Sequence, residues 1–125
     1  MLAEARAFSG FAVDDLERAR EFYAETLGLR VTEGPMAGLL TLHLAGERDT
    51  LVYEKPDFAP ATYTILNFVV DDVHEAVEQL EARGVRFERY DGFDQDEKGI
   101  ARGAGPSIAW FTDPAGNVLS VLQES

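Results

Sequence analysis

An internal repeat constrains the fold of this chain more than any other feature of its sequence. The segment 11–21 aligns with the segment 68–78 at a constant offset of 57 residues, with Phe, Val, Asp, Asp, Ala and Glu shared at matching positions. With one residue dropped, Gly28 then aligns with Gly84. Two copies are too few for a solenoid, which needs about three or more repeats. We therefore expect two similar modules, residues 1–57 and 58–125, that together form one domain.

Each copy predicts a strand, then a helix, then further strands. Asp15 and Asp72 each precede an apolar stripe of helical period, where a side-chain oxygen can cap the free amides of the first turn. Gly28 and Gly84 follow these stripes and suit the left-handed conformation that ends many helices. Besides the first strand of the second copy, the predicted strands are 7–13, 29–33, 39–44, 50–54, 85–90, 107–112 and 118–123. This pattern predicts an α+β protein built from two βαβββ modules.

Three connections between the predicted strands carry distinct signals. The segments 34–35 and 46–49 predict turns, and 113–117 reads Asp-Pro-Ala-Gly-Asn, which predicts a type I turn closed by glycine. The segment 91–106 is polar and glycine-rich, and it is too long for a tight hairpin. Two interpretations of it stay open: a mobile loop over a binding site, or a disordered connection without a role.

Charge and composition exclude several function classes. The chain has 11 Lys+Arg and 23 Asp+Glu, a formal charge of −12, so its surface repels phosphate and nucleic-acid binding is not expected. It has no cysteine, and therefore no disulfide and no thiolate metal site. No apolar run approaches the ~20 residues of a membrane span. Residues 1–6 lack the pattern of a signal peptide, so we expect a cytoplasmic protein.

Two motifs carry a resemblance to a known family. They are Val13-x-Asp15-Leu16-x-x-Ala19-x-x-Phe22-Tyr23-x-x-x-Leu27-Gly28 and, near the end of the chain, Phe111-x-Asp113-Pro114-x-Gly116-Asn117. With the repeat and the length, they make the chain resemble the vicinal oxygen chelate superfamily, which includes glyoxalase I, bleomycin-resistance and extradiol-dioxygenase proteins. The resemblance implies paired βαβββ modules whose curved sheets form a cleft, with the helices outside.

The resemblance also implies where metal-using members of this superfamily carry their ligands. The first-strand positions correspond to Phe8 and Ile65, and the last-strand position of the second module corresponds to Ser120. In the first module, Val52 and Glu54 both remain candidates for that position. Phenylalanine and isoleucine offer no lone pair, and a neutral serine hydroxyl is a poor ligand for a divalent ion. We therefore expect no metal, no other cofactor and no metal-dependent chemistry.

Strand alternation predicts the residues that line the cleft. If Phe8 and Ile65 face it, Asn67 does too, as an amide whose partner is either a ligand, a neighbouring side chain or water. Trp110 and Tyr53 could stack on a ligand or fill the core. No catalytic residue is identified, and the candidate ligand-binding residues are Phe8, Asn67, Trp110, Ser120, His43, Tyr53 and Glu54.

The chain has two histidines, and their positions differ. His74 lies in the first turn of a predicted helix on its exposed side, which indicates a surface residue. His43 alternates with leucines in a predicted strand, so it faces either the cleft or solvent. A histidine without a recognisable acid or nucleophile nearby is weak evidence for catalysis.

The sequence favours a metal-independent binding protein of the glyoxalase/bleomycin-resistance type, which sequesters a small, partly aromatic organic compound in a cleft. The acidic charge would suit a cationic ligand, and the resemblance implies a homodimer. The alternative is a superfamily enzyme, a lyase, isomerase or dioxygenase, with atypical metal ligands for which Glu54 and His43 are the best remnants. A third possibility is a structural or regulatory domain whose cleft is vestigial.

Overall fold

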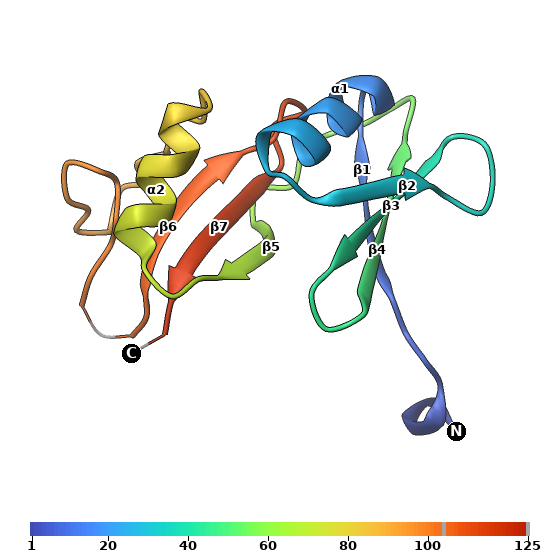
Figure 1. Cartoon of the computed structure of the whole chain (residues 1–125), viewed down its shortest axis with the longest axis horizontal. Helices are drawn as coiled ribbons and strands as arrows, with labels where there is room; N and C mark the ends of the chain where they lie inside the picture. The colour runs from blue at the N-terminus through green and yellow to red at the C-terminus, as the bar shows by residue number, and fades with distance from the viewer. Residues whose placement is uncertain (104, 125) are drawn as a thin grey trace. The chain divides into compact units, whose positions relative to one another are not determined.

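The computed structural model describes residues 1–103 and 105–124, and the chain divides into two compact units (Figure 1). The units are Met1–Ala59 and Pro60–Ser125. Each contains one sheet with a helix, so the α+β class expected from the sequence is confirmed. No helix in the described part of the chain has the length and apolar character needed to cross a membrane.

The first unit combines a four-stranded sheet with a short 3-10 helix and a longer helical segment (Figure 1). A short 3-10 helix, η1 (Leu2–Glu4), precedes β1 (Ser9–Val13), and α1 (Leu16–Glu21) continues directly into the π-helical turn η2 (Phe22–Thr26). Three strands follow: β2 (Arg30–Glu33), β3 (Leu39–Leu44) and β4 (Arg48–Glu54). Their spatial order is β1-β4-β3-β2, with β1 and β4 parallel and the other pairs antiparallel.

The second unit has a three-stranded sheet and a longer helix. Its elements are β5 (Thr64–Val69), α2 (Val73–Ala82), β6 (Ser107–Thr112) and β7 (Val118–Gln123). The order is β5-β7-β6, with β5 and β7 parallel and β6 and β7 antiparallel. In both units, therefore, the last strand in sequence pairs in parallel with the first.

Local signals place both helices where the sequence predicts them. The carboxylates of Asp15 and Asp72 each accept a hydrogen bond, 3.1 Å long, from the amide three residues further on. Gly28 and Gly84 follow the helices with φ of 74° and 90°, a conformation that residues with a Cβ rarely adopt. These caps and stops are short-range, which is why they can be recognised in the sequence.

The expected strand 85–90 is not formed, so the second unit is βαββ rather than βαβββ. Only an isolated bridge joins Phe87 to Phe111 on β6. Beyond it, the side chain of Gln95 accepts from the amide of Tyr90 at 2.8 Å and donates to the carbonyl of Glu88 at 2.9 Å. A side chain therefore takes the backbone groups that would extend this pairing, and the chain leaves the sheet.

The segment 113–117 forms the predicted turn and also anchors a distant segment. The amide of Asn117 donates to the carboxylate of Asp113 at 2.8 Å, and Gly116 closes the turn with φ of 97°. The side-chain oxygen of Asn117 accepts from the amide of Ala61 at 3.2 Å, shortly before β5. Asn117 is only 2% exposed, so this polar side chain is buried with its hydrogen-bonding capacity in use.

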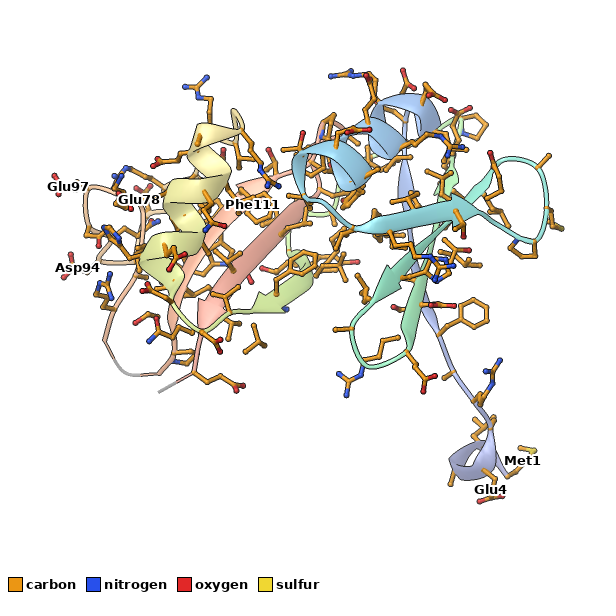
Figure 2. All side chains as sticks on the ribbon, in the orientation of Figure 1. Met1, Glu4, Glu78, Asp94, Glu97 and Phe111 are labelled. Carbon is orange, nitrogen blue, oxygen red and sulfur yellow. The ribbon has the colours of Figure 1, made fainter. Side chains whose placement is uncertain are left out.

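Each unit has its core between the sheet and the helix. In the first, the rings of Phe11 on β1 and Tyr23 on η2 lie 5.7 Å apart. In the second, Phe111 lies beside α2 (Figure 2). Its ring centroid is 5.5 Å from that of Phe87. Other residues buried in these cores are Val13, Ala19, Leu40, Leu42, Val52, Val73, Val77, Leu119 and Val121.

Candidate functional site

Each sheet has one face covered by its helix and one free of helix, which we call the open face. In the second unit, the side-chain oxygen of Gln123 accepts from the amide of Val73, the first residue of α2, at 2.9 Å. In the first unit, the carboxylate of Glu54 accepts from the amide of Leu16, the first residue of α1, also at 2.9 Å. Because side chains alternate along a strand, the open faces carry the other set of residues.

A hydrogen-bonded pair, Ser120 and Asn67, lies on the open face of the second unit. The two residues face each other across β7 and β5, and the Ser120 hydroxyl donates to the Asn67 carbonyl oxygen at 2.6 Å. Ser120 is fully buried, whereas Asn67 is exposed. The partner of Asn67 is thus a neighbouring side chain, one of the possibilities left open by the sequence. This bond directs the NH₂ group of Asn67 away from Ser120, where it can donate to another group.

An aromatic cluster lies next to this pair. Trp110 on β6 is opposite Ser120 in the register and is 8% exposed. Its ring centroid is 5.5 Å from that of Tyr90 and 4.8 Å from that of Phe93. Burial raises the pKa of the Tyr90 phenol, and the nearby carboxylate of Glu88 adds to this effect. The open face of the second unit therefore combines an aromatic cluster, in which Phe93 is 54% exposed, with an oriented amide.

The segment that supplies Phe93 has a defined structure in its described part. Besides its bonds to residues 88 and 90, Gln95 donates to the carbonyl of Gly99 at 2.7 Å. Ala101 forms a bridge with Ile108 of β6, with hydrogen bonds in both directions. Figure 2 shows the labelled Asp94 projecting outward from this segment. In its described residues, the segment 91–106 is therefore held by specific hydrogen bonds, and both interpretations of its role stay predictions.

Asp96 organises the tip of the same segment. Its carboxylate accepts from the amides of Lys98 and Ile100, both at 2.9 Å. Partial burial opposes ionisation of Asp96, but these two amides and the charge of Arg102 together hold its pKa below the ordinary value. Ile100 is fully buried beneath this turn. The segment is thus fixed by its own polar and apolar contacts.

The open face of the first unit is partly apolar. Phe8 precedes β1 and is 70% exposed, and Tyr53 on β4 is 39% exposed. The same face carries His43, whose ring nitrogens Nε2 and Nδ1 lie 2.7 Å from Thr32 Oγ1 and 3.1 Å from Asp49 Oδ1. Of the two faces left open for His43, it lies on the open one, and it has two polar neighbours that the sequence did not identify.

Glu54 does not join this face. Its carboxylate lies on the helix side, bound to the start of α1. The register identifies the residue of the first unit that matches Ser120. Positions 10 and 67 correspond, because they are separated by the repeat offset of 57 residues. Gly10 pairs with Leu51, and Asn67 pairs with Ser120. The first-module equivalent is therefore Leu51, and neither Val52 nor Glu54.

The residues at the four positions where the resemblance implies metal ligands do not fit a divalent metal ion. They are now Phe8, Leu51, Ile65 and Ser120, three hydrocarbon side chains and one hydroxyl that is bonded to Asn67. Within residues 1–103 and 105–124, no group of three or more His, Asp or Glu side chains is placed to hold a metal ion.

Sequence reasoning missed five residues that contribute to the open faces. Thr32 and Asp49 contact His43, but Asp49 was assigned to a turn, whereas β4 begins at Arg48. Leu51 could be found only from the pairing register. The other two pack against Trp110: Tyr90 ends the expected strand 85–90, which does not form, and Phe93 lies in the glycine-rich segment after it.

Comparison with known proteins agrees with this architecture. A family model, Glyoxalase/Bleomycin resistance protein/Dioxygenase superfamily, matches residues 7–121. None of the curated proteins matches the chain significantly. Among solved structures, TnmS3, an antibiotic binding protein from Streptomyces sp. CB03234, is 26% identical over 98% of each chain, with a TM-score of 0.72.

Two further solved structures are similar over most of their length. A glyoxalase/bleomycin resistance protein from Streptomyces sp. CB03234 is 27% identical over 94% of this chain and 100% of its own, with a TM-score of 0.64. Lactoylglutathione lyase from Agrobacterium tumefaciens shares the fold, at 22% identity over 96% of this chain and 93% of its own, with a TM-score of 0.69. Because the family model covers most of the chain, this protein belongs to the Glyoxalase/Bleomycin resistance protein/Dioxygenase superfamily.

Proposed function

We propose that this protein binds a small, partly aromatic organic molecule on the open face of its second unit, without metal chemistry. The observation that carries the proposal is the Ser120–Asn67 hydrogen bond beside Trp110. It leaves an oriented NH₂ donor next to an aromatic surface, a combination that suits a planar ligand with a carbonyl or other acceptor oxygen. TnmS3, described as an antibiotic binding protein, supports a binding role.

We propose the open face of the first unit, taken by itself, as a second surface for small organic molecules. Phe8 and Tyr53 expose aromatic rings there, and His43 lies on the same face. Glu54 is not included, because its carboxylate is bound to the start of α1. The formal charge of −12 favours a neutral or cationic ligand over an anionic one. We further propose that the protein acts as a homodimer.

A fluorescence titration tests the proposed binding site. Trp110 is the only tryptophan, so its emission reports directly on occupancy by a library of aromatic and cationic compounds. For a compound that binds, we expect Asn67→Leu to weaken affinity about 5- to 160-fold, because one hydrogen bond worth ~1–3 kcal/mol is lost. Gln79→Leu, the same change on the exposed side of α2, is the matched control and should leave affinity unchanged.

Three outcomes would contradict the proposal. Equal weakening by Asn67→Leu and Gln79→Leu would show that the compound does not contact the Asn67 amide. Elemental analysis of the purified protein that finds one tightly bound divalent ion per chain would show that metal chemistry had been excluded wrongly. Turnover of the bound compound that stops on chelation would favour the superfamily enzymes over a binding protein.

A further inference from the structure

Three polar side chains form a hydrogen-bonded row across the open face of the first unit. They come from adjacent strands: Thr32 from β2, His43 from β3 and Asp49 from β4. Thr32 Oγ1 is 2.7 Å from His43 Nε2, and Asp49 Oδ1 is 3.1 Å from His43 Nδ1. The His43 side chain is 25% exposed, so the row is shielded but remains accessible.

These contacts determine which nitrogen of a neutral His43 carries the proton. A carboxylate can only accept hydrogen bonds, so Asp49 requires a proton on Nδ1. The lone pair of Nε2 then faces Thr32, whose hydroxyl must donate to it. Thr32 Oγ1 is thereby polarised by a base, and that base is held in its tautomer by a carboxylate. A hydroxyl, an imidazole and a carboxylate in this order are the parts of an acyl-transfer site.

We propose that Thr32, His43 and Asp49 form an acyl-transfer site that accepts small activated esters. Thr32 Oγ1 bonds to the acyl carbon while its proton passes to Nε2 of His43. The ester C–O bond breaks, and the leaving oxygen takes that proton. Water then attacks the acyl carbon and gives one proton to Nε2. The bond from the acyl carbon to Thr32 breaks, and the proton returns to Oγ1, so the net reaction is ester hydrolysis.

The sheet register adds a cation beside this row. Arg30 on β2 lies directly opposite His43 and on the same face. Its side chain is exposed, so it can approach the negative charge that develops on the acyl oxygen during attack. The neighbours along the row are Thr41, opposite Thr32, and Leu51, opposite Thr41. Thr32 and His43 are the catalytic residues of this proposal, and Asp49 is a positioning residue.

Hydrolysis of p-nitrophenyl acetate by the full chain, with intact-mass detection of an acetyl adduct, tests the proposal. We expect an initial burst and one acetyl group on Thr32. Thr32→Val should abolish both, and Thr32→Ser should restore them. His43→Gln should lower the rate about 100-fold or more, the usual effect of removing a general base. His74→Gln, at the only other histidine, is the matched control and should leave the rate unchanged.

Nitrogen NMR of the two histidines gives a readout that does not depend on activity. We expect the neutral His43 ring to carry its proton on Nδ1, and Asp49→Asn to shift that proton toward Nε2 and lower the rate while the fold is retained. A proton on Nε2 in the unmodified protein would overturn the proposal. So would an adduct on any residue but Thr32, or equal rates for His43→Gln and His74→Gln. Ligand binding reported by Trp110 should survive Thr32→Val, so this site and the proposed binding site can fail separately.

Discussion

Ser120 shows how one small residue can change the chemistry of a site. The resemblance places a metal-binding carboxylate at this position in metal-using proteins, whereas here a buried hydroxyl donates to Asn67. The two strands keep their pairing, and the metal-ligand position becomes part of a neutral hydrogen-bonded pair. The open face thus carries a directed amide donor where the resemblance implies a metal ligand.

Tyr90 offers a test of the aromatic cluster at the scale of one residue. Its pKa is raised above the ordinary value of 10.0, first by burial and then by Glu88, because both disfavour the phenolate. This raised pKa contributes stability that is complete below pH 10.0 and is lost as the pH rises through the folded-state value. We expect Trp110 emission to be quenched with a midpoint above pH 10.0, since a phenolate 5.5 Å away quenches indole.

The variant Tyr90→Phe provides the control for this titration. It keeps the ring against Trp110 and removes the titrating hydroxyl, so the alkaline quenching step should disappear. A midpoint at or below pH 10.0 in the unmodified protein, or a step that persists in Tyr90→Phe, would contradict the expectation.

At the scale of elements, the last strand of each unit is tied to the first helix in the same way. Glu54 on β4 accepts from the first amide of α1, and Gln123 on β7 accepts from the first amide of α2. We expect Glu54→Ala and Gln123→Ala each to lower the free energy of unfolding by ~0.5–2 kcal/mol, the usual effect of losing a helix-start acceptor. Urea denaturation followed by circular dichroism measures this change.

Two further variants define the cause of that loss. Glu54→Gln keeps an acceptor oxygen and should retain most of the stability. Glu97→Ala removes an exposed carboxylate elsewhere and should change the free energy of unfolding by less than about 0.5 kcal/mol. If Glu54→Gln is as destabilising as Glu54→Ala, the hydrogen bond to α1 is not what stabilises the unit.

Elements set by local chemistry could be predicted from the sequence, and those set by distant pairing could not. Asp15, Asp72 and the turn at 113–117 act within a few residues, and strands β3, β6 and β7 have the predicted bounds. The segment 85–90 has strand-like composition, but the side chain of Gln95 forms hydrogen bonds with the backbone groups of Glu88 and Tyr90 that would extend the pairing with β6. The sequence contains no local signal for that competition.

The candidate site follows the same division. Alternation predicted which face of its own strand Asn67 occupies, and likewise for Ser120. That prediction needs only the side-chain period of a single strand. The match between Leu51 and Ser120 required the registers of two parallel pairs. The row of Thr32, His43 and Asp49 required the registers of three strands together. No pattern within one segment could reveal these neighbours.

At the scale of the whole molecule, exposed apolar side chains support the proposed homodimer. Phe8, Tyr63 and Val69 are 70%, 70% and 61% exposed. A second copy that covers such surface is the commonest solution among soluble assemblies. We expect light scattering to give about twice the chain mass of 13.8 kDa at micromolar concentration. A mass near 13.8 kDa under those conditions would contradict the homodimer.

The position of the last strand within each sheet has a consequence for synthesis on the ribosome. In the first unit, β4 lies between β1 and β3, and all of its strands have been made once Glu54 has emerged. In the second unit, β7 is the central strand, so β5 and β6 have no sheet to join until residues up to Gln123 have been translated. The first unit can therefore fold while the second is being made, and the apolar strands β5 and β6 stay unpaired until β7 has been translated.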